Sequence, residues 1–183
     1  MQAIIDACKA GLLDATPVLV ISNNSNSGAA DKALKENIPF LHLSITTHPD
    51  VDELDAAITD AIIKSMADLV ILAGYMKKIG PRLLKAYSGR ILNIHPALLP
   101  KFGGEGMFGM NVHKAVIEAG ESESGCTVHT IDKEYDRGKI LSQTKVPVLP
   151  EDTPEILAAR ILEKEHQLYW QTIKAIARGE MKL

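Results

Sequence analysis

The chain has 183 residues, a length typical of one domain with a single sizeable core. Hydrophobic residues make up 46% and charged residues 23%, which argues against disorder, and no apolar run reaches the ~18 residues of a membrane span. The formal net charge is -3, so basic residues are not in excess. We therefore expect neither a nucleic-acid nor a membrane partner. No signal peptide follows Met1, so we expect a cytoplasmic location, although an organellar targeting segment ahead of Met1 stays open.

Apolar periodicity predicts alternating helices and short strands in the first part of the chain. The spacing of Ile4, Cys8 and Leu12 predicts a first helix that ends near residues 11–14. The elements expected next are a strand at 17–21, a helix at 29–36 and a strand at 40–43. This alternation is typical of α/β proteins.

A longer helix is expected after Pro49. Asp50 can cap it, and Glu53 lies three residues later, where its side chain can reach back to the cap. Apolar residues at a spacing of four predict its buried side. They are Leu54, Ile58, Ile62 and Met66.

The runs 69–73 and 91–92 are apolar on both faces, which is typical of strands in a parallel sheet covered by helices. After residue 124, the runs 126–131 and 140–148 follow one another with one turn between them, which predicts antiparallel strands. Thr153 and Pro154 then begin a long final helix. Its expected buried residues are Leu157, Ile161 and Leu168.

Together these elements predict an α/β fold with a doubly wound, mostly parallel sheet and antiparallel C-terminal strands. We expect a single domain over residues 1–183. Doubly wound folds normally begin with a strand, whereas this chain begins in a helix. The domain is therefore expected to be truncated at its N-terminus.

Asn93 and His95 follow the run 91–92, at or just past the C-terminal end of the expected strand. Residues two apart in extended chain point to the same side, so an amide and an imidazole would face one spot. Open α/β sheets bind ligands at this edge. The ordinary alternative is a capping asparagine and a surface histidine, which would be the better interpretation of an isolated Asn-x-His.

The later segment 126–138 carries three carboxylates in a turn, on Asp132, Glu134 and Asp136. Most such acids are solvated turn residues. One of them placed against His95 would instead raise the pKa of its imidazole by stabilising the charged form.

Residues 102–109 contain four glycines but do not join a strand to a helix in the manner of a phosphate-binding loop, so a mobile flap is the better interpretation. Lys77 and Lys78 come just after an expected strand. Lysines in such a place are most often solvated, but a role in binding an anionic ligand stays open.

The six histidines lack a tight acid or thiol cluster, so no metal site is expected. Surface or locally bonded side chains are expected for His42, His48 and His113.

The segment 93–100 resembles the signature of folate-dependent formyltransferases, and in detail that of the glycinamide ribonucleotide transformylase group. Residues 72–76 are similar to that group's folate-pocket segment, and residues 125–129 and 136–141 are similar to its later signature. The resemblance covers nearly the whole chain in the same order, which makes it more specific than any single motif. It also implies that an opening strand and a phosphate-gripping loop are missing ahead of Met1.

This resemblance implies roles for individual residues. The catalytic residues would be Asn93, His95 and Asp136. The folate would be held by Met76, Lys77, Lys78, Ile79 and Asn93. Glu165 would contact glycinamide ribotide. The implied reaction transfers a formyl group from 10-formyltetrahydrofolate, as co-substrate and without a metal, to the amine of 5-phosphoribosylglycinamide in de novo purine biosynthesis.

Two other functions stay open. The Asn-x-His segment is also similar to that of formyltetrahydrofolate hydrolases, which give the formyl group to water. Members of that family carry a regulatory domain before the transferase-like domain, and no such domain is expected in these 183 residues. A non-catalytic truncated remnant is the other alternative, against which the three intact catalytic positions argue. The sequence leaves the oligomeric state open.

Overall fold

The computed structural model describes residues 1–183, which form six helices and six strands. The helices are α1 (Gln2–Lys9), α2 (Gly28–Lys35), α3 (Val51–Lys64), α4 (Pro81–Ala86), α5 (Met110–Glu118) and α6 (Pro154–Ala177). The strands are β1 (Val20–Ser22), β2 (Phe40–His42), β3 (Val70–Ile71), β4 (Ile91–His95), β5 (Glu123–Thr130) and β6 (Ile140–Pro147). Each element expected from the sequence is present, and α4 is an additional helix that its apolar pattern did not indicate.

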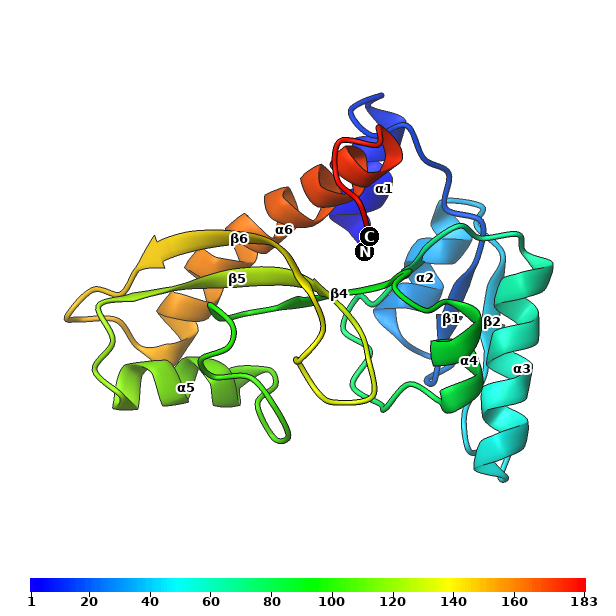
Figure 1. Cartoon of the computed structure of the whole chain (residues 1–183), viewed down its shortest axis with the longest axis horizontal. Coiled ribbons are helices and arrows are strands. Elements are labelled where there is room, and N and C mark those ends of the chain that lie inside the picture. The colour runs from blue at the N-terminus through cyan, green and yellow to red at the C-terminus, as the bar shows by residue number, and fades with distance from the viewer.

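The strands form two sheets rather than one (Figure 1). β1 and β2 pair in parallel, and the second sheet has the order β3-β4-β5-β6. In that sheet β3 and β4 are parallel, whereas β4–β5 and β5–β6 are antiparallel. The α/β class, with parallel strands followed by antiparallel C-terminal strands, is thereby confirmed.

β1 and β3 do not pair with one another, and each lies at an edge of its sheet. Their apolar residues Val20, Ile21, Val70 and Ile71 are half-buried, although strands of this composition are typical of the interior of a parallel sheet. The reason is their position, since an edge strand has a neighbour on one side only.

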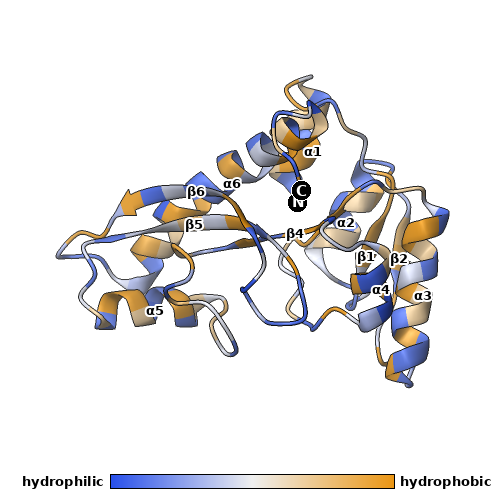
Figure 2. Cartoon of the chain, in the orientation of Figure 1, coloured by the Kyte–Doolittle hydropathy of each residue, from blue (hydrophilic) through white to orange (hydrophobic).

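Two apolar clusters stabilise the fold. The larger cluster joins β4, β5 and β6 to α1, α5 and α6, and the smaller one lies among α3, α4, β3 and β4. Leu157, Ile161 and Leu168 of α6 are buried in the larger cluster, as expected. In Figure 2 the strands β5 and β6 carry both hydrophobic and hydrophilic colour, whereas the connection between them is largely hydrophilic. None of the helices has both the length and the apolarity needed to cross a bilayer.

The cap expected at Asp50 is confirmed, and Thr153 forms a second cap at the expected start of the last helix. The Asp50 side chain accepts hydrogen bonds from the amides of Asp52 (2.9 Å) and Glu53 (3.0 Å) at the start of α3. Thr153 accepts one from the amide of Ile156 (3.3 Å) at the start of α6. Both caps partner amides that would otherwise have no acceptor within the helix.

The expected apolar stripes extend too far at two helix ends. Leu12 is 48% exposed and Met66 is 85% exposed, because α1 ends at Lys9 and α3 ends at Lys64. In both α1 and α3, an apolar residue at the helical spacing follows the last hydrogen-bonded turn. The apolar pattern alone therefore did not locate these helix ends.

Asp55 connects α3 to the start of α4. Its carboxylate, 7% exposed, accepts hydrogen bonds from the amides of Arg82 (2.7 Å) and Leu83 (3.3 Å). Gly80, the residue before α4, has no cap of its own, and a Cβ at that position would overlap the Asp55 carboxyl group. The side chain of one helix therefore caps the next and fixes the end of the β3–α4 loop.

We expect Asp55→Ala to lower the free energy of unfolding by about 1–3 kcal/mol, because it leaves the buried amide of Leu83 and the partly buried amide of Arg82 without an acceptor. Urea denaturation measures this loss as a lower midpoint. Asp60→Ala, an exposed position on the same helix, is the matched control and should change little. Equal losses in the two variants would contradict the capping role of Asp55.

Candidate active site

The register of β4 against β5 assembles the candidate site. Asn93 pairs with His129, and His95 pairs with Thr127. Directly paired residues of antiparallel strands point to the same face, and so do residues two apart on one strand. The four side chains therefore share one face of the sheet, as the spacing of Asn93 and His95 predicted for that pair. Ile94 and Val128 occupy the opposite face, in the larger apolar cluster.

His95 is the last residue of β4 and is only 3% exposed. Its Nε2 lies 2.7 Å from the backbone oxygen of Phe102, and its Nδ1 lies 3.6 Å from Oδ2 of Asp136. A carbonyl oxygen can only accept, so Nε2 donates and carries a hydrogen. In the neutral ring Nδ1 is then the free base, and it faces a carboxylate.

Asp136 is the one acid of the β5–β6 turn that reaches His95. Its Oδ2 accepts a hydrogen bond from the amide of Gly104 (2.9 Å), and its Oδ1 lies 3.5 Å from Nε2 of His129. Asp132 instead accepts a local turn bond from the amide of Glu134 (2.8 Å). The carboxylate of Asp136 thus lies between two imidazoles.

His129 determines the orientation of the Asn93 amide. The Nδ1 of His129 donates to the carbonyl oxygen of Thr130 (2.9 Å), so the neutral ring has its lone pair on Nε2. That nitrogen lies 3.2 Å from Nδ2 of Asn93, which donates to it. One N–H and the oxygen of the Asn93 amide remain for other partners.

Burial controls the protonation of both histidines. It lowers the pKa of His95 below its ordinary value, and this effect outweighs the opposing influences of Asp136 and the Phe102 carbonyl. Burial lowers the pKa of the fully buried His129 in the same way. As expected, the acid beside His95, Asp136, acts to raise the pKa of the imidazole. Burial lowers that pKa by more, so the net shift is downward and the ring is neutral near pH 7.

His113 is buried, which corrects the expectation of a surface or locally bonded side chain. It lies on α5, is 5% exposed, and its Nδ1 has no hydrogen-bond partner. Burial lowers its pKa, and the charge of nearby His95 lowers it further. His48 is half-buried and bonds locally to Thr47, as expected, and His42 is half-buried as well. No group of three or more His, Cys, Asp or Glu side chains is placed to hold a metal ion.

The segment expected to hold folate is the loop between β3 and α4. Met76, Lys77 and Lys78 are exposed there, and Ile79 packs against the smaller apolar cluster. The Nζ of Lys78 lies 6.0 Å from the centre of the Tyr135 ring, a cation–π distance. This contact brings the loop beside the turn that carries Asp136.

Glu165 lies on α6, which packs against the opposite face of the sheet from Asn93 and His95. Burial raises the pKa of Glu165 to about 7, and the ammonium group of Met1 opposes that rise. The structure records no hydrogen bond from Glu165 to the site on the other face, so its role in binding a ribotide stays a prediction.

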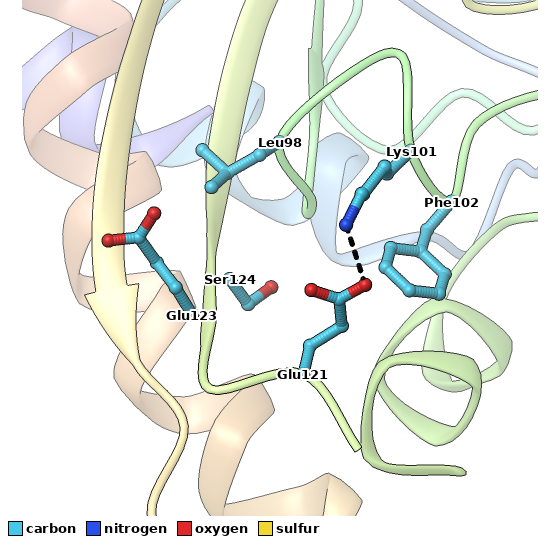
Figure 3. A pocket seen from close by; sticks show the side chains of 6 residues that line it. All are labelled: Leu98, Lys101, Phe102, Glu121, Glu123 and Ser124. Atoms are coloured by element: carbon cyan, nitrogen blue, oxygen red, sulfur yellow. Dashed lines mark hydrogen bonds and ion pairs between the residues drawn. The ribbon is translucent and has the colours of Figure 1, made fainter. Parts of the chain in front are cut away.

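The expected flap, residues 102–109, contacts the site through its first residues, Phe102 and Gly104. A cavity of about 210 Å³ lies beside Phe102 (Figure 3). It is lined by Leu98, Lys101, Phe102, Glu121, Glu123 and Ser124. Lys101 and Glu121 form an ion pair of 2.8 Å in it. Asn93, His95 and Asp136 do not line this cavity, so it is separate from the candidate site.

Sequence reasoning assigned no role to His129 or Thr127. Thr127 donates to the carbonyl oxygen of Ala97 (2.6 Å) and accepts from the amide of Leu99 (3.0 Å), which holds the chain after His95 against β5. The available signal was alternation along the strand: Thr127 and His129 are polar residues two apart in an apolar run, the same pattern that singled out Asn93 and His95.

Known proteins resemble this chain over nearly its whole length. Phosphoribosylglycinamide formyltransferase from Arabidopsis thaliana, a chloroplastic protein, is 43% identical over 182 residues, which are 99% of this chain and 62% of the relative. The protein of the same name from Haemophilus influenzae is 40% identical over 186 residues, with 100% of this chain and 84% of the relative covered. The crystal structure of glycinamide ribonucleotide transformylase 1 from Symbiobacterium toebii superposes with a TM-score of 0.92 at 36% identity, covering 100% of this chain and 84% of that one.

The chain thus spans less than two thirds of the length of the Arabidopsis relative. The family model described as formyl transferase matches residues 1–173. The matched region contains β4, β5 and the turn with Asp136, which together form the site described above. On these grounds the chain belongs to the formyl transferase family.

Proposed function

We propose that this protein transfers a formyl group from 10-formyltetrahydrofolate to the primary amine of 5-phosphoribosylglycinamide. The observation that carries the proposal is the convergence of Asn93, His95 and Asp136, with the free base Nδ1 of His95 directed at the carboxylate. Membership of the formyl transferase family supports the reaction type. The names of the Arabidopsis and Haemophilus relatives support the choice of substrate.

Asn93 is proposed to stabilise negative charge on the formyl oxygen. Attack of the amine on the formyl carbon moves charge onto that oxygen, and a fixed N–H aimed there lowers the barrier. His129 holds one N–H of the Asn93 amide and leaves the other available, so the amide is oriented before substrate arrives. Such preorganisation avoids reorienting the donor during the reaction.

His95 is proposed to carry the proton between the two substrates. The attacking amine must lose a proton and the departing folate nitrogen must gain one, so a single base can serve both, directly or through a water molecule. The neutral ring can accept this proton at Nδ1, 3.6 Å from Asp136, whose negative charge would stabilise the imidazolium. No net proton is consumed.

The remaining residues are proposed to bind the substrates. The loop Met76–Ile79 is proposed to bind the folate. Its support is the contact between Lys78 and Tyr135, which brings the loop beside the turn that carries Asp136. Glu165 is proposed to contact the glycinamide ribotide, with the family resemblance as its only support.

Replacing His95 by asparagine should reduce the turnover of formyl transfer by about 10²–10⁴-fold, since it removes the proton carrier. Turnover is measured with both substrates saturating, and circular dichroism checks that the fold survives. His48→Asn is the matched control, because the His48 side chain lies outside the candidate site and bonds only to its neighbour Thr47. Wild-type turnover in His95→Asn would exclude the proposed proton transfer.

The pH profile should report the pairing of His95 with Asp136. Activity should fall as pH decreases below the ordinary histidine value of about 6.5, because a protonated His95 no longer accepts a proton. Asp136→Asn removes the charge that raises the pKa of His95, so the acid limb should move to lower pH and the rate should fall. Glu134→Gln in the same turn is the control. An acid limb at the same pH in all three proteins would contradict the pairing.

The transferase and hydrolase functions are separated by omitting the amine substrate. Supplied with 10-formyltetrahydrofolate alone, the protein should release no formate above the His95→Asn background. Addition of 5-phosphoribosylglycinamide should start formation of the formylated product. Steady formate release without the amine would instead identify a hydrolase, and no product under either condition would support a non-catalytic chain.

A further inference from the structure

We propose that Phe102–Gly104 is a positioning segment for His95 and Asp136: the Phe102 carbonyl selects which nitrogen of His95 is protonated, and the Gly104 amide holds the Asp136 carboxylate against the ring. The proposal rests on the function proposed above, in which this pair handles the reaction's proton. It gives the beginning of the glycine-rich loop a chemical role that a simple flap would not have.

The Phe102 carbonyl determines the tautomer of His95. It lies 2.7 Å from Nε2 and can only accept, so a neutral ring with its hydrogen on Nδ1 would lose this bond. The side chain of Phe102 packs against the larger apolar cluster, which anchors the residue. Its backbone has a φ of +55°, a conformation that non-glycine residues adopt rarely. Such strained backbone persists where surrounding contacts hold it.

Gly103 and Gly104 bring the backbone close to Asp136. A Cβ on Gly103 would lie 2.5 Å from Cδ2 of Leu99 and 3.2 Å from Cβ of Asp136, so only glycine fits without displacing one of them. The next amide, that of Gly104, donates to Oδ2 of Asp136 (2.9 Å), the same oxygen that lies 3.6 Å from Nδ1 of His95. This bond fixes the oxygen that meets the ring.

The segment thus contacts both members of the pair at once. Its carbonyl leaves the lone pair of His95 on Nδ1, and its amide keeps the carboxylate opposite that lone pair. The other titratable groups near His95 are His129 on β5 and His113 on α5, both with lowered pKa values and so neutral near pH 7. Asp136 is therefore the charged group that raises the pKa of His95.

Gly104→Ala tests the segment, and Gly106→Ala is its matched control. Both glycines have left-handed backbone, with φ of +104° and +82°, and a Cβ on either would meet no atom within 4 Å. The two substitutions therefore impose a similar conformational strain on the same loop. They differ because the amide of Gly104, and not that of Gly106, donates to Asp136.

Nuclear magnetic resonance of the histidine ring nitrogens gives a readout that does not depend on activity, with His95→Asn used to assign the His95 signals. In the wild-type protein, the neutral His95 ring should carry its hydrogen on Nε2. In Gly104→Ala the pKa of His95 should shift downward, because Asp136 is no longer held beside it, whereas Gly106→Ala should keep the wild-type pKa. In kinetics, Gly104→Ala should lower kcat by about 10–100-fold with little change in KM.

A hydrogen on Nδ1 of the neutral wild-type ring would overturn the role of Phe102, and this measurement requires no variant to fold. Equal His95 pKa values in the two alanine variants would overturn the role of Gly104. If both ring measurements hold while no formyl transfer is detected, the positioning segment stands and the proposed function fails. If formyl transfer is detected but Gly104→Ala and Gly106→Ala have the same His95 pKa and kcat, the proposed function stands and the positioning segment fails.

Discussion

Because β4 pairs antiparallel with β5, Asn93 lies opposite His129 and His95 lies opposite Thr127, and every other contact of the site depends on that register. A slip of one residue would turn these side chains to the face occupied by α6, and would turn Ile94 and Val128 out of the larger cluster. The register that buries the apolar residues on one face therefore also assembles the polar residues on the other.

The same pairing controls the path of the chain beyond the strands. Thr127, next to His129 on the polar face, holds the segment after His95 through Ala97 and Leu99. Gln143 on β6 adds a hydrogen bond of 2.9 Å to the Leu99 carbonyl. The chain is thereby directed back over the polar face, where Phe102 and Gly104 meet the site. Rigid strands thus position loops that carry the chemistry.

Burial and charge act in opposite directions within the site. Removing water from three imidazoles favours their neutral forms, and the single carboxylate of Asp136 opposes this effect without overcoming it at His95. A neutral ring beside a carboxylate is suited to accepting a proton, because the product is a buried ion pair of opposite charges. The β3–α4 loop, whose far end is fixed by Asp55, leaves Met76, Lys77 and Lys78 exposed to solvent.

The sequence by itself determined the order and type of every element except α4, the cap at Asp50, and the shared direction of Asn93 and His95, because these follow from local periodicity and short-range hydrogen bonds. The resemblance to known formyltransferases added the choice of Asp136. Only the tertiary structure decided that the strands form two sheets, that His113 is buried, and that His129 fixes the Asn93 amide. These features depend on contacts between residues far apart in the chain. The net pKa of His95 was decided there too, since burial is a property of the packed molecule and no local pattern records it.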